Sequence, residues 1–297
     1  MARNTGKSRV LIIADPEGRR QVALGRGFML AERLGRKAHV VGFCHESLAA
    51  LEGANKALAA KARKSVIRLR KESLKAQIEA HDTSGIKVTN EVVWSKRIHE
   101  WVEDECKQQP PEVIVKTGHR TETFMYTPTD WHLIRDCATP TLIVAEKKWR
   151  KTRPVMAAVD LTTRSRSKQQ LNKEVIKAAS QYAQAMDCPL YLLHAIHISP
   201  VLSELDMIDE YSHEKEIRAK LARRVEKMCS DLDIPNDHVL LKRGPADKVI
   251  VSESARLKAQ LLVVGTIGRR GARAKLLGNT AEKVLMLART DLLVIKP

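Results

Sequence analysis

Near the carboxyl end of the chain, a glycine-rich loop joins an apolar run to a helical pattern, and its residue types suit phosphate binding. Gly265, Gly268 and Gly278 follow the run LLVV with the spacing G-x2-G-x9-G, and Asn279 and Thr280 stand at the predicted start of a helix. Glycine lets a ligand approach the backbone and permits positive φ. A helix N-terminus presents unpaired N–H groups and a positive dipole to an anion. The loop therefore predicts a phosphate site, with the Asn279 amide or the Thr280 hydroxyl as a further donor.

The spacing of this loop excludes two common nucleotide motifs. It fits neither G-x-x-x-x-G-K-[ST] nor G-x-G-x-x-G. The structural alternative is a plain turn followed by a helix that Asn279 caps, because asparagine is a good N-cap residue. Basic side chains within the loop raise the local positive potential; they are Arg269, Arg270, Arg273 and Lys275.

The elements that must position the loop occur twice in the chain, as an internal sequence repeat. Apolar runs of the first half have counterparts, in the same order, in the second half. RVLIIAD (Arg9 to Asp15) matches PVMAAVD (Pro154 to Asp160), and EVIVKTG (Glu112 to Gly118) matches LLVVGTIG (Leu261 to Gly268). Stretches with apolar residues at helical spacing lie between the runs. Each half therefore predicts the order βαβαβαβαβ.

This alternation indicates an α/β protein with two tandem, doubly wound domains. Alternating strands and helices form a mainly parallel sheet, covered on both faces and joined by right-handed crossovers. We predict domains at residues 1–149 and 150–297, with the charged stretch Glu146 to Arg153 between them and five parallel strands in each.

The predicted strand order, 3-2-1-4-5, fixes where a ligand would bind. In such sheets ligands bind beyond the carboxyl ends of the strands, where the chain order reverses, here between strands 1 and 4. The order places Asp160 beside Gly265 in the second half, and Asp15 beside Lys116 in the first. The glycine loop is therefore expected at the ligand-binding edge of its sheet.

Charge and composition limit the classes of function. The chain has 52 Lys and Arg against 35 Asp and Glu, a net charge of +17. This excess raises the hypothesis of nucleic-acid binding, yet both halves share it and neither has a basic tail. The densest basic segment, Lys56 to Lys75, reads as an amphipathic helix with a solvated face. Its predicted core-facing residues are Leu58, Ala62, Val66, Leu69 and Leu74.

Hydropathy and cysteine usage predict a soluble, cytoplasmic protein. No apolar run approaches the roughly 18 residues that a membrane helix needs, and Val10 to Ala14 is too short for a signal peptide. The cysteines are scattered and form no CxxC pair, which indicates reduced thiols rather than a disulfide frame or zinc site. They are Cys44, Cys106, Cys137, Cys188 and Cys229.

The chain resembles the universal stress protein family, and its tandem arrangement is most similar to the two-domain, E-type members. The resemblance rests on the glycine spacing, the Asp-ending first strand and the closing strand LLVIKP. Its most specific matches are TPTDWHLIRDCATPTLIV (Thr127 to Val144) and LLGNTAEKVL (Leu276 to Leu285). It implies a doubly wound, HUP-like fold, a homodimer or a pseudo-dimer of the two halves, and a stress-response role. It implies no established catalytic reaction, with weak ATPase activity left open.

Nucleotide-binding members of this family hold ATP through the glycine loop and the aspartate of the first strand. The resemblance implies that Asp160 contacts the ribose or base and that magnesium arrives with the triphosphate. Binders usually have Ser or Thr after the last glycine, where this chain has Asn279, with Thr280 next to it. The implied nucleotide-site residues are Asp160, Gly265, Gly268, Gly278, Asn279 and Thr280.

The first half departs from this pattern. Lys116 and His119 replace the first two glycines, and Thr127-Pro128 stands where Gly278-Asn279 would. Proline suits a helix start but removes an N–H from a phosphate site. We therefore expect the first domain to have lost nucleotide binding and to serve as a scaffold or hold another ligand.

Other functions stay open from the sequence. His194 and His197 are expected on one strand with opposite orientations, which disfavours a shared metal. His119 and His132 are candidates for acid–base or metal chemistry, or are ordinary surface histidines. The apolar and acidic connection His197 to Glu216 favours packing between halves or subunits, or a cover over an apolar pocket. The alternatives are therefore an interaction protein or carrier of an apolar ligand, and a basic stress protein associated with nucleic acid.

Overall fold

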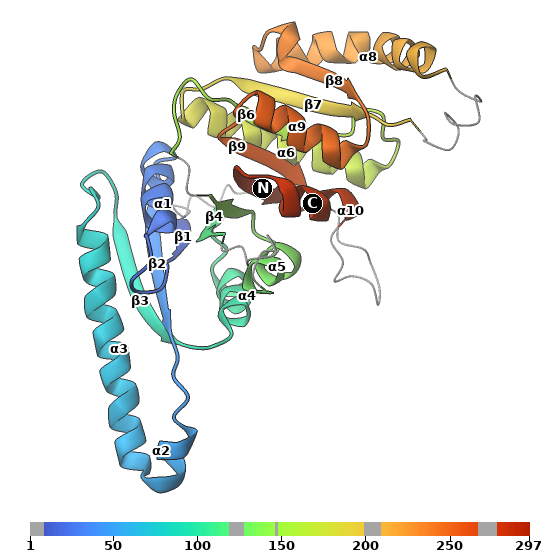
Figure 1. The fold of residues 1–297 in the computed structure, drawn as a ribbon. Helices are drawn as coiled ribbons and strands as arrows, with labels where there is room; N and C mark the ends of the chain where they lie inside the picture. The colour runs from blue at the N-terminus through green and yellow to red at the C-terminus, as the bar shows by residue number, and fades with distance from the viewer. Residues whose placement is uncertain (1–8, 119–127, 146–147, 199–208, 267–277) are drawn as a thin grey trace. The chain divides into compact units, whose positions relative to one another are not determined.

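The computed structural model describes residues 9–118, 128–145, 148–198, 209–266 and 278–297. The chain forms two compact units, residues 1–146 and 147–297, and each is an α/β domain (Figure 1). Within the described residues, no helix combines the length and the apolar character needed to cross a membrane.

The first domain contains a parallel sheet in the order β3-β2-β1-β4-β5. Each strand is joined to the next along the chain by at least one helix. The elements are β1 (Arg9–Ile13), α1 (Val22–Arg33), β2 (Lys37–Cys44), α2 (Ala49–Ala54), α3 (Lys56–Glu79), β3 (Val88–Trp94), α4 (Ile98–Gln108), β4 (Val113–Thr117), α5 (Pro128–Asp136) and β5 (Thr141–Val144).

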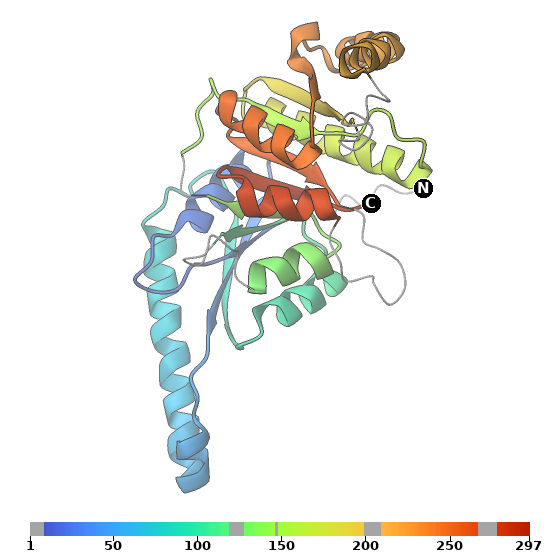
Figure 2. The same cartoon turned by 45° about the vertical axis from the view of Figure 1, so that its right-hand side comes forward.

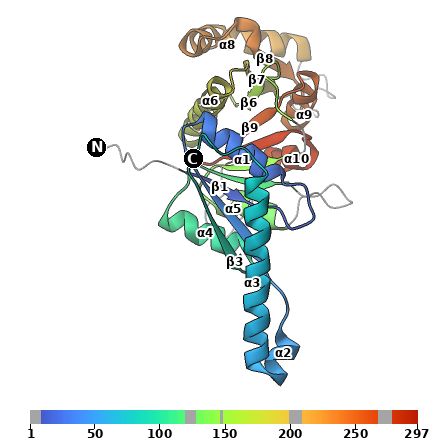
Figure 3. The ribbon, with the colours of Figure 1, turned by 90° about the vertical axis from the view of Figure 1, so that its left-hand side faces the viewer.

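The second domain repeats this topology in the order β8-β7-β6-β9-β10, with every pair parallel. Helices α6 and α9 cover opposite faces of its strands (Figure 3). The elements are β6 (Val155–Ala158), α6 (Arg166–Ala185), β7 (Leu190–Ile196), α8 (Glu210–Leu232), a 3-10 turn (Asn236–His238), β8 (Val239–Arg243), α9 (Ala246–Arg256), β9 (Leu261–Gly265), α10 (Asn279–Leu287) and β10 (Asp291–Ile295). The predicted fold class and the strand order 3-2-1-4-5 are confirmed in both domains.

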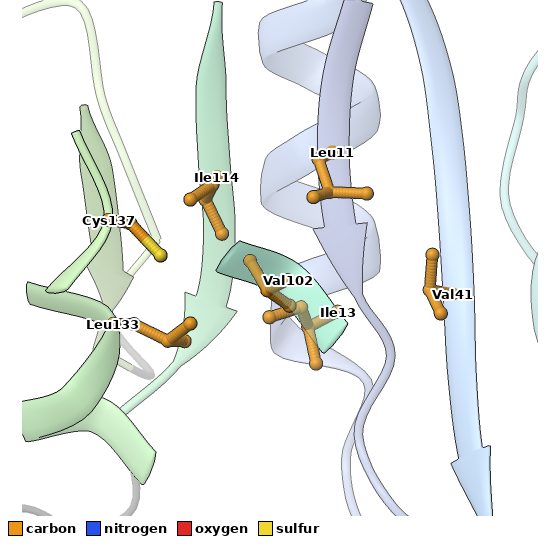
Figure 4. Close-up of a cluster of buried hydrophobic side chains, with 7 residues drawn as sticks. All are labelled: Leu11, Ile13, Val41, Val102, Ile114, Leu133 and Cys137. Carbon is orange, nitrogen blue, oxygen red and sulfur yellow. The ribbon is translucent and has the colours of Figure 1, made fainter. Parts of the chain in front are cut away.

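The central strands are largely apolar and buried because helices cover both faces of the sheet, whereas the edge strand β3 includes exposed Thr89, Asn90 and Glu91. In β1, Leu11 and Ile13 pack in one cluster with Val102 of α4 and Leu133 of α5 (Figure 4). Ile12 points to the other face, where α1 approaches so closely that a Cβ on Gly27 would lie 2.4 Å from its side chain. Alternate residues of one strand thus serve two separate halves of the core.

The predicted core-facing residues of the basic helix α3 are in part wrong. Leu58 and Leu69 are 48% and 55% exposed, so they do not face a core. Leu74 is buried, as predicted, and the buried residues also include Ala59 and Ile78, because the carboxyl-terminal part of the helix packs on β2 and β3. The amino-terminal part of α3, with α2, extends beyond the strands of its own domain (Figure 2, Figure 3). Apolar spacing alone did not identify which part of the helix contacts the sheet.

Candidate functional site at the carboxyl ends of β6 and β9

A cavity of about 820 Å³ opens in the second domain at the carboxyl ends of its strands. This volume lies within the range of about 300–1,000 Å³ that is typical of small-molecule sites. Its lining comes from β6, β7, β9, α6, α8, α9 and α10. Five of the six residues assigned to the nucleotide site line it, and Gly268 lies outside the described residues. The five are Asp160, Gly265, Gly278, Asn279 and Thr280.

Asp160 is held at the cavity edge by a side chain of α6. Asn172 Nδ2 donates to the carbonyl of Asp160 at 2.7 Å, and the Asp160 N–H donates to Asn172 Oδ1 at 3.1 Å. The Asp160 carboxylate accepts hydrogen bonds at Oδ1 from the N–H and the hydroxyl of Thr162, at 3.2 and 3.0 Å. Asn172 is buried, so it fixes the backbone from which this half-buried carboxylate faces the cavity. The sequence analysis did not identify Asn172, whose role depends on how α6 packs.

Gly265 has a packing role that does not depend on a ligand. A Cβ at this position would lie 2.6 Å from Leu171 Cγ, because α6 crosses β9 at close range. Real Cβ atoms essentially never approach another heavy atom this closely, so a larger residue would displace the helix. Gly265 therefore lines the cavity and, because it has no side chain, also allows α6 to pack closely on β9.

The N-terminus of α10 faces the same cavity without a side-chain cap. Gly278 is the N-cap residue, with φ of −65°, and Asn279 is the first residue of the helix. The prediction that Asn279 caps the helix is therefore wrong, and Gly278 does not need the positive φ that glycine permits. Among the described residues, nothing lies within 4 Å of a Cβ on Gly278, and the side chains of Asn279 and Thr280 are exposed. The first turn of α10 thus lines the cavity at a position that suits phosphate binding.

Two buried polar atoms at the cavity have no hydrogen-bond partner among the described residues. They are Nε2 of His194 and Oγ1 of Thr266. His194 is 3% exposed, and its Nδ1 lies 3.3 Å from both the Leu161 nitrogen and the Val159 oxygen. Burial lowers the pKa of His194, so its imidazole is neutral at pH 7. A buried polar atom without a partner is costly, and a ligand in the cavity would offer one.

The two histidines of this region lie differently from the prediction. His194 is in β7, but His197 follows the end of that strand and is exposed, so the alternation of a strand does not apply to it. Both line the cavity. Within the part of the chain that the structure describes, no group of three or more His, Cys, Asp or Glu side chains has the arrangement of a metal site.

The first domain fills the corresponding place with its own side chains. Lys116 is buried, and its Nζ lies 2.6 Å from Asp130 Oδ1 and donates to the carbonyl of Thr117 at 3.0 Å. The Thr117 hydroxyl donates to the buried carboxylate of Asp15 at 2.7 Å, and Arg70 donates to the Asp15 carbonyl at 2.8 Å. The parallel registers pair Ile13 with Lys116 and Ala158 with Val264, so the prediction that Lys116 replaces the first glycine is wrong: Thr117 stands where the second domain has Gly265. The charge of Lys116 is neutralised internally by a carboxylate of α5.

The structure places some of the remaining candidate site residues of the first domain, and others lie outside the described residues. Pro128 begins α5, as predicted, whereas His119 and Thr127 lie outside the described residues. His132 stacks on His99 with ring centroids 4.0 Å apart, and its Nδ1 lies 3.1 Å from Asp136. His132 therefore belongs to a local cluster between α4 and α5.

Replacing Gly265 with alanine should lower the free energy of unfolding of the second domain by about 1–3 kcal/mol, the usual range for overpacking. The matched variant is Gly278→Ala, which meets no neighbouring atom and should change stability by less than about 1 kcal/mol, as expected for an N-cap glycine. Urea unfolding of both variants measures the difference. Equal losses would contradict the packing role of Gly265.

The second domain should lose stability as the pH falls below about 6.5, the ordinary pKa of histidine. The pKa of His194 is lower in the folded than in the unfolded state, so the unfolded state binds more protons in acid. The stability that the neutral ring provides is complete above the unfolded pKa and is lost as the pH falls through the folded pKa. His194→Gln should flatten this dependence, whereas the exposed control His197→Gln should keep it. Thermal unfolding between pH 7 and 5 distinguishes the two results.

Comparison with known proteins places this architecture in one family. The model of the universal stress protein family matches residues 151–296. Universal stress protein E of Salmonella typhi is 30% identical over 97% of this chain and 94% of its own length. Universal stress protein E of Escherichia coli K12 is 28% identical over 97% of this chain and 93% of its own.

Solved structures share the tandem fold. A functionally unknown protein from Pseudomonas aeruginosa PAO1 superposes with a TM-score of 0.73 at 22% identity, over 98% of this chain and 93% of that one. A universal stress protein from Archaeoglobus fulgidus gives a TM-score of 0.57 at 16% identity, over 98% and 99% of the two chains. At these identities the likeness concerns the fold alone. The near full-length sequence match to universal stress protein E decides the family: the chain is a tandem, E-type member of the universal stress protein family of stress-response proteins.

Proposed function

We propose that the second domain binds an adenine nucleotide in the cavity beside β6 and β9, and that the chain acts as a regulatory module rather than as an enzyme. The observation that supports this most is the placement of the Asp160 carboxylate and the uncapped N-terminus of α10 around one cavity. A carboxylate accepts hydrogen bonds from ribose hydroxyls, and a helix N-terminus binds phosphate.

Each part of the ligand has a matching part of the lining. Apolar side chains such as Val159, Ile196 and Ile250 offer a surface for the base. His194 Nε2 and the Thr266 hydroxyl provide hydrogen-bonding atoms that have no other partner among the described residues. Thr280, in the first turn of α10, supplies the hydroxyl that Asn279 lacks. Magnesium would come with a triphosphate, because it retains water and phosphate ligands more readily than it enters a protein cage.

A thermal-shift titration tests this function. ATP, ADP and AMP, each with magnesium, should raise the unfolding temperature of the second domain, because a ligand at 100 Kd adds about 2.7 kcal/mol to the free energy of unfolding. An unchanged transition at millimolar concentrations of all three would show that this cavity is not a nucleotide site. Measurement of phosphate release in the same samples tests weak ATPase activity, which we expect to be absent.

A second candidate function follows from the apolar part of the same lining. The side chains of Val175, Ile196, Ile217, Ile250 and Val284 would also suit an apolar metabolite, with the protein acting as a carrier. Native mass spectrometry of the freshly purified chain distinguishes the two functions, since a non-nucleotide adduct would favour the carrier. Formation of a homodimer, or of a pseudo-dimer of the two halves, stays a prediction that light scattering can decide.

A further inference from the structure

A pair of cysteine thiols lies in the core of the first domain, whereas the proposed nucleotide site belongs to the second domain. Cys137, directly after α5, is 2% exposed and belongs to the cluster of Leu11, Val102 and Leu133 (Figure 4). Cys106 is on α4, four residues after Val102 and therefore on the same face of that helix. Its partly buried side chain packs against the cluster that contains Cys137. The fold thus brings together two cysteines that are distant in the sequence.

We propose that Cys106 and Cys137 are a peroxide-sensitive dithiol, which a hydroperoxide converts into a disulfide joining α4 to the segment after α5. The Cys106 thiolate attacks the peroxide, the O–O bond breaks, and a sulfenic acid forms as the alcohol or water leaves. The Cys137 thiol then attacks the sulfenic sulfur, the S–S bond forms, and water leaves. Two thiols lose two electrons and two protons in total, and the peroxide takes up both.

The surroundings favour Cys106 as the attacking thiol. Hydrogen bonds from Cys137 and Thr139 and the charge of Arg9 lower the pKa of Cys106 to about 7, against the opposing effects of burial and Glu105. Its partial exposure leaves access for a small oxidant. A low-pKa, partly exposed thiol beside a second thiol is the typical setting for reversible oxidation.

The other cysteines with perturbed pKa values serve as internal controls. Burial raises the pKa of Cys44, Cys188 and Cys229, so these thiols are less ionised at neutral pH. The lowered pKa gives Cys106 a larger thiolate fraction at pH 7 than an ordinary cysteine has. Iodoacetamide should therefore alkylate Cys106 about tenfold faster than Cys188 in the folded chain.

Peptide mapping of the folded, full-length wild-type chain after treatment with one equivalent of hydrogen peroxide tests the proposal. The expected product is a Cys106–Cys137 linked peptide whose mass is lower by two hydrogen atoms and which dithiothreitol cleaves. The Cys188→Ser control should give the same product. In Cys137→Ala, oxidation should stop at a sulfenic acid on Cys106 that dimedone traps.

Three results would overturn the proposal: linked peptides that pair other cysteines, oxidation of Cys106 to a sulfinic acid without a disulfide in the wild type, or alkylation of Cys106 no faster than of Cys188. The wild-type map does not depend on any variant, so it decides the matter even if Cys137→Ala unfolds. Circular dichroism before and after peroxide confirms that the chain stayed folded during the reaction.

Discussion

Replacing Asp130 with alanine is expected to lower the free energy of unfolding of the first domain by about 3–5 kcal/mol, the usual loss when a buried ion pair loses one partner. Asp130 is fully buried, and its carboxylate lies 2.6 Å from the ammonium group of Lys116, which is also buried. Without the carboxylate, the ammonium group must be desolvated without compensation, or lose its proton. Either alternative destabilises the folded state.

A double variant that lacks both charges tests this pair. Lys116→Met combined with Asp130→Leu removes both charges and keeps apolar volume, so it should recover most of the stability that Asp130→Ala loses. Three of the four tryptophans, Trp94, Trp101 and Trp131, are in the first domain, so tryptophan fluorescence during urea unfolding reports mainly on it. The exposed Asp104→Ala, on α4, should leave the transition unchanged. A loss below about 1 kcal/mol for Asp130→Ala would contradict the account of the pair.

Replacing Asp160 with alanine is expected to reduce the affinity for adenine nucleotides about 10- to 100-fold. The change removes a carboxylate acceptor whose hydrogen bond to a ligand hydroxyl is worth about 1.5–3 kcal/mol. The effect on folding should be small because the carboxylate is only half-buried and its partner, Thr162, lies at the surface. The variant therefore separates binding from stability.

A matched control makes this result specific. Asp187→Asn removes a carboxylate from an exposed position that pairs with Lys151, and asparagine tolerates the positive φ of 50° found there. Its nucleotide affinity should equal that of the wild type when both are measured by calorimetric titration. Equal affinities for wild type and Asp160→Ala would exclude Asp160 from the site.

The sequence predicts the fold well because the two patterns that define it, apolar runs and stretches with helical spacing, are local and occur in both halves. Alternating apolar runs and helical stretches define the elements, and the strand order follows from the doubly wound topology. Asp160 and Gly265 are brought to one edge because β6 and β9 are parallel neighbours, with Ala158 opposite Val264. This proximity needs no knowledge of side-chain packing, so it could be inferred from the repeat.

Features that depend on packing were not predicted. Asn172 acts through the position of α6 on the sheet, and His194 acts through contacts with the segment after β6, and no spacing rule provides either. The close approach of Leu171 gives Gly265 a structural reason that a motif alone does not contain. Similarly, Leu58 and Leu69 have helical spacing but are exposed, because spacing does not show which side of α3 packs on the sheet.

The two domains show how one topology can retain or lose a ligand site. At the carboxyl ends of β1 and β4, Thr117 stands at the position of Gly265 and its hydroxyl donates to Asp15, Arg70 donates to the Asp15 carbonyl, and Lys116 pairs with Asp130. At the carboxyl ends of β6 and β9, glycine and small polar residues leave a cavity. We therefore expect nucleotide binding at one site per chain, in the second domain alone.

The most direct test of this claim is calorimetric titration of the full-length wild-type chain with ADP and with ATP and magnesium. The proposed site predicts saturable binding of one nucleotide per chain, weakened by Asp160→Ala and unchanged by Asp187→Asn. Absence of binding at millimolar nucleotide, or binding that persists unchanged in Asp160→Ala, would contradict it.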